Sequence, residues 1–297
     1  MIISRLIGGL GNQMFQYAAA CRLASRHRTN QKLDLTFFKN IQQGTTTRRF
    51  ELDKLNISAK IASKREIAEM KGEIKSKFHC SSLLHLKKLQ KQAISPMVFT
   101  EQFTYFNEEV LSLSDNVYLD GYWQSEKYFT DIENIIRMEF TVKRKPDSIN
   151  MQKSQEIIKV NSVSLHIRRG DYVTDLETNQ HHGTCSLAYY ENAVNILADL
   201  TKDPHFFVFS DDPVWAKTNF KTDYPVTFID HNSADKCYED MRLMCLCRHH
   251  IIANSSFSWW GAWLSNNPDK IVIAPSRWFV DPERSTVDLL PHTWIKI

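Results

Sequence analysis

Short apolar runs and helical repeats of apolar side chains alternate from the first residues of the chain. Residues 2–7 form an apolar run typical of a strand, and the glycine-rich residues 8–11 are typical of a turn. Apolar side chains then recur near helical spacing over 12–27, and residues 31–37 return to a strand pattern. The chain is therefore predicted to begin with a strand, a turn, a helix and a second strand.

The pattern is weaker in the next eighty residues. Residues 38–59 have no regular period, and the lysine-rich stretch 60–92 is predicted to form an exposed helix. Residues 117–123 are typical of a strand that leads into a turn. Ser125 is placed to cap the helix that follows, and helical spacing continues over 131–140.

Strict alternation of strands and helices follows a polar, proline-containing break at 143–147. The predicted strands are 162–168, 206–209, 226–229, 250–253 and 271–274, and the predicted helices are 150–160, 187–200, 213–220, 234–248 and 256–264. Strands separated by helices of this length predict a parallel sheet that is covered on both faces. We therefore predict an α/β protein with two domains, 1–145 and 146–297.

Composition restricts the class of protein without naming it. The chain has 297 residues, 42% of them hydrophobic and 24% charged, which is ordinary for a globular protein. The net charge of +3 is too small to demand a nucleic-acid partner. The apolar runs are too short to span a membrane, and the N-terminus lacks the features of a signal peptide. The six cysteines are dispersed, so we expect reduced thiols and a cytoplasmic protein.

The lysine-rich stretch 60–91 has two interpretations. Its lysines are interrupted by few acids, so it is predicted to be a solvated helical face. The alternative is weak peripheral attraction to an anionic membrane surface or carrier lipid. We expect no metal site, because Cys245 and Cys247 are two residues apart and would not face each other on a helix.

The strongest candidate for chemistry is the basic cluster at the end of the predicted strand 162–168. It contains His166, Arg168 and Arg169, followed by Gly170 and Asp171. Adjacent residues of an extended chain point to opposite sides, so the two arginines are expected to have different roles. Arg168 is a candidate for gripping a phosphate or diphosphate with its planar donor fork. The alternative is an arginine pair in structural salt bridges with Asp171.

The glycine turn at the start of the chain is a second candidate. Gly9 and Gly11 follow a strand and open a helix at Asn12 and Gln13, which is the context in which backbone N–H groups receive an anion. The turn partly matches a dinucleotide fingerprint, with Asp34 about twenty residues further on. A tight connection between strand and helix with no ligand also explains the glycines.

Two acidic positions add to the picture. Ser210, Asp211 and Asp212 lie at a strand end, where one acid would cap the next helix and the other would hold an arginine or a ribose hydroxyl. Asp240 lies in a predicted helix among apolar residues, so it needs a partner. A salt bridge to a nearby arginine would supply one, and so would the N1–H and N2–H donors of a guanine base.

The stretch from Asn254 to Leu264 is the second strong segment. Asn254, Ser255 and Ser256 stand at a strand-to-helix turn, where the unpaired N–H groups of the first helical turn and the hydroxyls would form a neutral phosphate cradle. The tryptophans that follow are typical of core packing. Arginine, glycine turn and serine-rich helix start together suit a diphosphate that is held without a metal ion.

These segments resemble the α-1,2-fucosyltransferases, which are family 11 of the glycosyltransferases. The matching stretches occur in the family's order and run from the first residues to beyond position 264; they are GGLGNQMFQYA at 8–18, HIRRGDY at 166–172, VFSDD at 208–212 and NSSFSWWGAWL at 254–264. A further stretch, GYWQSEKYF at 121–129, is also similar. The resemblance implies a GT-B fold, in which two Rossmann-like domains face each other across a donor-binding cleft. The domain 1–145 would be on the acceptor side and 146–297 would bind the donor.

The resemblance also implies a reaction. It is the inverting, metal-independent transfer of L-fucose from GDP-β-L-fucose to the 2-hydroxyl of a terminal β-galactoside, with no cofactor, in O-antigen or other surface-glycan synthesis. The acceptor would include lipid-linked oligosaccharides. An NAD-dependent oxidoreductase and a non-catalytic carbohydrate-binding protein are the alternatives, because of the glycine turn and the seven tryptophans respectively.

The family's roles carry over to individual residues. Arg168 would bind the β-phosphate and stabilise the departing GDP, and Asp171 is a second catalytic candidate. The other residues expected to bind the donor are Gly9, Gly11, Asn12, Gln13, His166, Arg169, Ser210, Asp211, Asp240, Asn254, Ser255, Ser256 and Phe257. Trp123 and Glu126 are candidates for the acceptor. The general base is left open between Asp171, Glu126 and Asp34.

Overall fold

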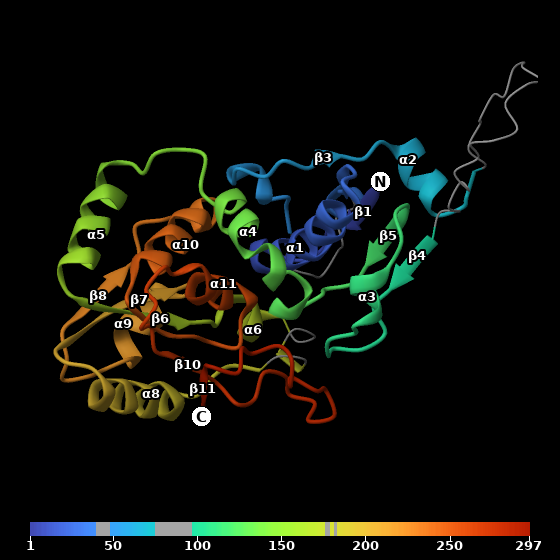
Figure 1. Ribbon diagram of the computed structural model, residues 1–297. Helices are drawn as coiled ribbons and strands as arrows, with labels where there is room; N and C mark the ends of the chain where they lie inside the picture. The colour runs from blue at the N-terminus through green and yellow to red at the C-terminus, as the bar shows by residue number, and fades with distance from the viewer. Residues whose placement is uncertain (40–47, 75–96, 176–178, 181–182) are drawn as a thin grey trace, which may run out of the picture.

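The computed structural model describes residues 1–39, 48–74, 97–175, 179–180 and 183–297 (Figure 1). The first half of the chain contains a five-stranded parallel sheet in the order β3-β2-β1-β5-β4. Its strands are β1 (Ile2–Arg5), β2 (Gln31–Asp34), β3 (Lys60–Ile61), β4 (Met97–Thr100) and β5 (Val117–Asp120). The helices of this half are α1 (Leu10–His27), α2 (Lys64–Met70), α3 (Glu109–Ser112) and α4 (Glu133–Glu139).

The second half contains a six-stranded parallel sheet in the order β11-β10-β9-β6-β7-β8. Its strands are β6 (Asn161–Ile167), β7 (Pro204–Ser210), β8 (Val226–Ile229), β9 (His249–Ile251), β10 (Val272–Ala274) and β11 (Ile295–Lys296). Its helices are α5 (Ser148–Lys159), α6 (Gly170–Thr174), α8 (Leu187–Leu200), α9 (Pro213–Asn219), α10 (Cys237–Leu246) and α11 (Ser256–Leu264). The strands of the two sheets lie on either side of the boundary expected at residue 145.

Each sheet has one place where the chain reverses the direction in which strands are added. In the first sheet this place lies between β1 and β5, and in the second it lies between β6 and β9. Ligands of open parallel sheets bind outside the carboxyl ends of the strands at such switch points. The glycine turn follows β1, the basic cluster follows β6 and the serine-rich turn follows β9, so the topology brings the predicted motifs to these positions.

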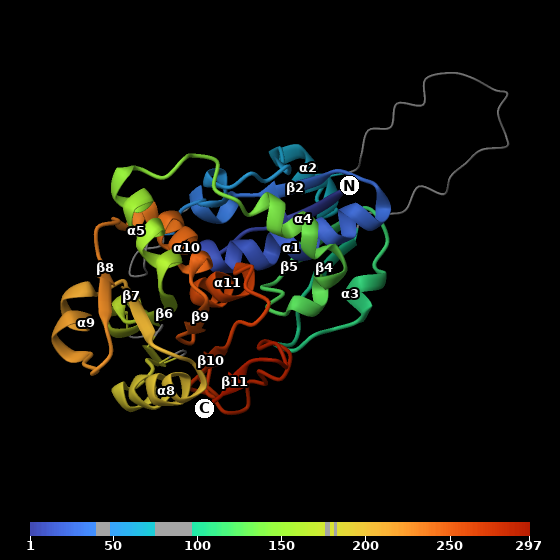
Figure 2. The same ribbon diagram turned by 60° about the vertical axis from the view of Figure 1, so that its left-hand side comes forward.

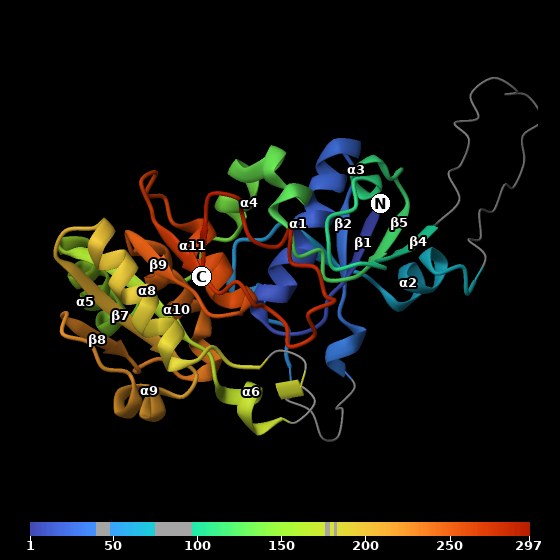
Figure 3. The same cartoon turned by 90° about the horizontal axis from the view of Figure 1, so that it is seen from below.

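The two halves share one hydrophobic core, which is built around α1 and α11. Phe15 of α1 lies 4.5 Å from the ring centre of Trp259 and 4.8 Å from that of Trp260, both of α11. The same core includes Phe129 and Phe140 of the first half. Figures 2 and 3 show α1 and α11 side by side between the two sheets. Two Rossmann-like halves that face each other in this way form the GT-B fold, which confirms the predicted fold class.

Several elements differ from the sequence prediction. Residues 60–74 form the short strand β3 and the two-turn helix α2 instead of one long helix, and residues 75–92 lie outside the described chain. Ser63 ends the strand segment because its side chain caps α2 in a capping box with Glu66. The strands β4 and β11 were not predicted, and α10 ends at Leu246 rather than at 248.

Candidate active site

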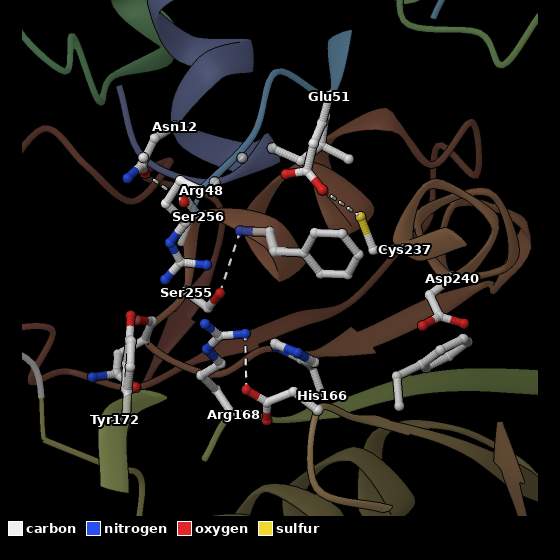
Figure 4. A pocket seen from close by; sticks show the side chains of 18 of the residues that line it. Asn12, Arg48, Glu51, His166, Arg168, Tyr172, Cys237, Asp240, Ser255 and Ser256 are labelled. Atoms are coloured by element: carbon white, nitrogen blue, oxygen red, sulfur yellow. Dashed lines mark hydrogen bonds and ion pairs between the residues drawn. The ribbon is translucent and has the colours of Figure 1, made fainter. Parts of the chain in front are cut away.

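A cavity of about 1050 Å³ lies between the carboxyl ends of the two sheets. It is lined by the residues that follow β1 and β5 in the first half and by those that follow β6, β7, β8 and β9 in the second. Figure 4 shows Asn12, Arg48 and Glu51 on one wall, with His166 and Arg168 on the opposite wall. Both switch points therefore open into one space, whose volume is large enough for a nucleotide sugar.

Arg168 is the first residue after β6, and Asp211 at the end of β7 positions it. Its Nη1 lies 2.9 Å from Asp211 Oδ2, while the other oxygen of Asp211 accepts the N–H of Arg169 at 2.8 Å. A Cβ at Gly170 would lie 2.3 Å from the Asp211 carboxylate, so a glycine is needed for this approach. The acid fixes the arginine in the wall of the cavity, as expected for one member of the pair Asp211 and Asp212. Asp212 instead caps α9.

Arg169 points the other way, as its place next to Arg168 on an extended chain predicts. Its guanidinium lies 3.8 Å from the ring centre of Trp215, and it does not line the cavity. Gln13 is also outside the cavity. Its side chain is fully buried, donates to the carbonyls of Gly8 and Arg49, and accepts from the N–H of Glu51. Arg169 thus makes a stacking contact and Gln13 anchors a loop, and the donor contacts expected of both stay a prediction.

His166 is buried beside Arg168 with one edge toward the cavity. Burial, with a smaller contribution from the Arg168 charge, lowers the pKa of His166 to about 3, so its ring is neutral. Its Nδ1 has no hydrogen-bond partner among the described residues, and its ring centre lies 5.8 Å from that of Phe257. A buried ring nitrogen of this kind is suited to a hydrogen bond with a ligand.

The start of α11 joins the two halves of the molecule. Ser255 caps the helix by accepting the N–H of Phe257, and Ser256 donates to Asn12 Oδ1 at 2.6 Å. Gln124 donates to the same oxygen at 2.9 Å. Gly11 makes this junction possible, because a Cβ there would lie 2.5 Å from the Ser256 carbonyl carbon. Serine hydroxyls, the helix N-terminus and Arg168 thus surround one part of the cavity, which suits an anion.

Asn254, Ser210 and Phe257 also line the cavity. The buried side-chain amide of Asn254 donates to the backbone carbonyls of Gly183 and Trp278, and the backbone carbonyl of Asn254 accepts the Tyr172 hydroxyl. Asn254 therefore holds three surrounding segments in place around the serine-rich turn.

Asp240 of α10 lies at the opposite end of the cavity from Tyr172 (Figure 4). Its Oδ1 accepts the Asn232 amide at 2.8 Å, and Asn232 and Asn150 exchange two further amide hydrogen bonds. Burial raises the pKa of Asp240 to about 7, although the bond from Asn232 opposes this shift. Arg242 pairs with Glu239 instead, and no arginine is among the groups that shift the pKa of Asp240. Because the Asn232 amide holds one oxygen of Asp240, the carboxylate keeps one orientation in the wall of the cavity.

The predicted acceptor residues lie elsewhere. Trp123 is 1% exposed and packs in the core, and Glu126 accepts the indole N–H of Trp263 at 2.9 Å in a separate pocket. Asp34 is fully buried and accepts the Tyr118 hydroxyl, so it is not placed to bind a ribose or to act as a base. The backbone of Asp171 lies in α6, and its side chain is outside what the structure describes.

The structure adds cavity residues that the sequence analysis did not select, namely Arg48, Glu51, Glu101, Tyr122, Gln124, Asn232 and Arg284. Asn232 follows β8, so the strand-end rule used for the other motifs would have found it. Glu101 follows β4, which the weak apolar pattern did not reveal. Among the described residues, no three His, Cys, Asp or Glu side chains gather as ligands for a metal ion, and the described cysteines are free thiols.

Two parallel sheets whose switch points face one cavity have the arrangement of a GT-B glycosyltransferase. The sequence model of Glycosyl transferase family 11 matches residues 1–297, and the chain belongs to this family. The resemblance found in its motifs is thereby confirmed. Membership of this family leaves the oxidoreductase and the non-catalytic binding protein without support.

Two relatives from Escherichia coli are similar over nearly their whole lengths. An α-1,2-colitosyltransferase is 38% identical and is matched over 100% of this chain and 99% of its own length. The O-antigen biosynthesis glycosyltransferase WbnK is 32% identical, with 99% of each chain covered. The fucosyltransferase NodZ from Bradyrhizobium has a TM-score of 0.49 and 15% identity, with 88% of this chain and 90% of that chain covered. In the part of the chain that is described, we find no helix long and apolar enough to cross a membrane.

Proposed function

We propose that this family 11 glycosyltransferase moves L-fucose from GDP-β-L-fucose to the 2-hydroxyl of a terminal β-galactoside, with inversion and without a metal ion. The observation that supports the proposal most is the convergence of Arg168, held by Asp211, with the N-terminus of α11 in one cavity. Similar proteins named as an α-1,2-colitosyltransferase and an O-antigen glycosyltransferase support a role in surface-glycan synthesis.

Inversion is achieved by one in-line displacement at the anomeric carbon. The acceptor oxygen attacks from the face opposite GDP, and the bond between the anomeric carbon and the phosphate oxygen breaks with its electron pair leaving on GDP. Negative charge therefore grows on the β-phosphate in the transition state. Arg168 and the N–H groups at the start of α11 are placed to stabilise this charge, which is where binding energy lowers the barrier.

The Asp240 end of the cavity suits the guanine base. Guanine presents N1–H and N2–H side by side, and an ionised carboxylate accepts both. Asn232 holds Asp240 in one orientation at 2.8 Å. Adenine lacks this pair of donors, so GDP is expected to bind in preference to ADP. No metal ion is needed for the charge on the diphosphate, because arginine and the helix N-terminus supply positive potential.

Colitose is the second candidate for the transferred sugar, because a relative that is 38% identical is named as a colitosyltransferase. Colitose is fucose without its 3-hydroxyl group. A site that hydrogen-bonds this hydroxyl would reject the sugar that lacks it, because buried polar groups of the site would be left unpaired.

One assay tests the donor, the linkage and the metal requirement together. The protein is incubated with lactose and either GDP-L-fucose or GDP-L-colitose, in parallel reactions with Mg²⁺ and with EDTA. We expect release of GDP and an α-1,2-linked product from GDP-fucose, at rates that EDTA does not reduce. Faster transfer from GDP-colitose would replace fucose by colitose in the proposal. Absence of transfer from both donors would overturn it, and a rate abolished by EDTA would overturn the metal-independent mechanism.

The natural acceptor is proposed to be a cytoplasmic β-galactoside, including a lipid-linked oligosaccharide at the inner face of the membrane. Peripheral contact would use the lysine-rich stretch 60–91, of which residues 75–91 lie outside the described chain. Replacing the lysines of this stretch by glutamine is expected to move the protein from the membrane fraction to the soluble fraction of cells. An unchanged distribution would exclude this contact.

A further inference from the structure

The cavity has two ends that differ in chemistry. At one end, α10 contributes Asp240 and Cys237, and the thiol of Cys237 donates to Glu51 at 3.3 Å. In the middle, Arg168 and the start of α11 form the anion site described above. With guanine at Asp240 and the diphosphate at Arg168, the transferred sugar must extend toward the other end of the cavity.

That other end is reached through Gln124, which donates to Asn12 beside the anion site. Gln124 belongs to the segment after β5, and the neighbouring strand β4 ends at Thr100, directly before Glu101. Glu101 and Tyr122 line the cavity from this side. They come from the first half of the chain, opposite the half that holds the proposed leaving group.

The carboxylate of Glu101 is held by the backbone of the turn after β5. Its two oxygens accept the N–H of Tyr122 at 2.6 Å and the N–H of Trp123 at 3.0 Å. A Cβ at Gly121 would lie 2.4 Å from the Cβ of Glu101, so the glycine permits this close contact. Trp123 has a φ of 55°, a conformation that costs a non-glycine residue free energy and that tends to occur at functional sites. The turn at residues 121–123 thus holds the Glu101 carboxylate in one position.

The second half of the chain contacts the first half at this end of the cavity. Thr104 donates to the carbonyl of Ser285 at 3.0 Å, and Asp288 accepts the N–H of Phe106 at 3.1 Å. Arg284 lines the cavity from the same segment. Glu101 therefore lines the cavity where the two halves of the chain meet.

Exposed aromatic residues follow Glu101 in the chain, although they are not among the residues that line the cavity. Phe103 and Tyr105 are stacked, with ring centres 4.8 Å apart, and they are 49% and 41% exposed. Tyr122 is 43% exposed. The exposed ring of Tyr122, which lines the cavity, suits the apolar C–H face of a galactose, whose hydroxyls would meet the polar groups of Glu101 and Arg284.

The other carboxylates that are described in the cavity are less well placed to face an attacking hydroxyl. Those of the second half come from the same half as Arg168, which holds the proposed leaving group; they are Asp175, Asp211, Asp230 and Asp240. Glu51 comes from the first half, but it contacts Cys237 at the end assigned to guanine. Among the described carboxylates of the cavity, Glu101 is the one that comes from the first half of the chain and lies at the end assigned to the transferred sugar.

We propose that Glu101, Thr104, Tyr122 and Arg284 form the acceptor subsite, and that Glu101 is the general base of the transfer. The inference rests on the proposed function. As the acceptor oxygen forms its bond to the anomeric carbon, its proton passes to the Glu101 carboxylate, and GDP leaves with the electron pair of the broken bond. The proton is then released to solvent. The hydrogen bonds from the turn keep the carboxylate in place while it gains the proton.

Electrostatics at this end of the cavity are compatible with the role. Burial raises the pKa of Glu101, which brings a carboxylate closer to the range of an efficient base near neutral pH, while the two backbone hydrogen bonds limit the shift. The charges of Arg5, Arg48 and Arg284 act on its partner Tyr122, and those of Glu101 and Asp288 act on Tyr128.

The test compares Glu101→Gln with the native protein, using the nucleotide sugar and acceptor on which the native protein is active. We expect kcat to fall by about 10²- to 10⁴-fold, while the Kd for GDP stays at its native value. The native rate is expected to rise with pH through the pKa of Glu101, because the base must be ionised. This rise should be absent in Glu101→Gln. Glu108→Gln removes an exposed acid from the same loop and is expected to behave as the native protein.

Thermal denaturation and GDP binding establish that the variants are folded. Glutamine has one acceptor oxygen for the two N–H groups, so Glu101→Asp is measured as well. The aspartate keeps a carboxylate but withdraws it by one methylene, and we expect a reduced kcat with the rise in rate retained. A folded Glu101→Gln protein with a kcat within tenfold of the native value and the native pH profile would overturn the role of Glu101 while leaving the proposed function intact. If Glu101→Gln is unfolded, a native kcat in Glu101→Asp would overturn that role in the same way. A native protein that transfers sugar from neither donor would overturn both the function and this inference.

Discussion

The contact between α1 and α11 at Gly11 gives the sharpest test of how the two halves are assembled. In a Gly11→Ala variant, the added Cβ would lie 2.5 Å from the carbonyl carbon of Ser256 and 2.6 Å from the N of Phe257. Both are backbone atoms, which cannot move aside as a side chain can. The ends of the two helices must therefore separate by about 1 Å to reach ordinary van der Waals contact.

The expected magnitude follows from this displacement. Overpacking of a well-packed interior costs roughly 1–3 kcal/mol, which for a protein of this size lowers Tm by about 2–12 °C. The same displacement lengthens the hydrogen bond between Ser256 and Asn12, now 2.6 Å, toward the limit of such bonds. The start of α11 would then be misplaced relative to the diphosphate, so weaker GDP binding is expected with the loss of stability.

Gly9→Ala is the matched control for stability. It lies two residues away in the same turn, has a negative φ, and its Cβ would meet only the tip of the Arg48 side chain at 3.5 Å. Differential scanning calorimetry and GDP titration of both variants measure the two effects. A Gly11→Ala protein with the Tm of Gly9→Ala and the GDP affinity of the native protein would refute the view that close backbone contact at Gly11 sets the junction.

Two further predictions concern the nucleotide. Arg168→Ala is expected to lower kcat by about 10²- to 10³-fold in a folded protein. Arg168→Lys should have an intermediate kcat, because lysine keeps the charge but lacks the planar guanidinium. Near-native turnover in Arg168→Ala would exclude a role of Arg168 in stabilising the leaving group. Asp240 must be ionised to accept two donors from guanine, and its pKa is about 7 in the free protein. GDP affinity should therefore fall about tenfold per pH unit below 7, and Asp240→Asn should abolish this dependence in isothermal titrations; an unchanged pH profile in that variant would place guanine elsewhere.

Much of the donor half could be predicted from the sequence because its signals are local. A strand end, a glycine or a serine before a helix, and an acid before Pro213 each act through neighbouring backbone atoms. The alternation of side chains on β6 separated Arg168 from Arg169 without any knowledge of the fold. The sequence also predicted that one of Asp211 and Asp212 would hold an arginine and the other would cap a helix, because both acids stand directly before the helix that starts at Pro213.

The other half of the site depends on contacts between residues far apart in the chain. Glu101 is placed by a turn twenty residues later, and the strand that precedes it has a pattern too short to stand out. Gln13 looked like a donor ligand because it opens α1, but its side chain is used to anchor residues 49 and 51. Glu126 was an expected acceptor residue, whereas packing turns it toward Trp263.

The aromatic cluster of Phe15, Trp259 and Trp260 has a consequence for how this protein can be divided or recombined. Cutting the chain at residue 145 would expose large rings on both fragments, so neither is expected to remain dispersed in water on its own. A chimaera that joins the first 145 residues of one relative to the remainder of another would bring together helices whose side chains were not selected as a pair. Exchange of acceptor preference between relatives should therefore succeed only when α1 and α11 are inherited from the same parent.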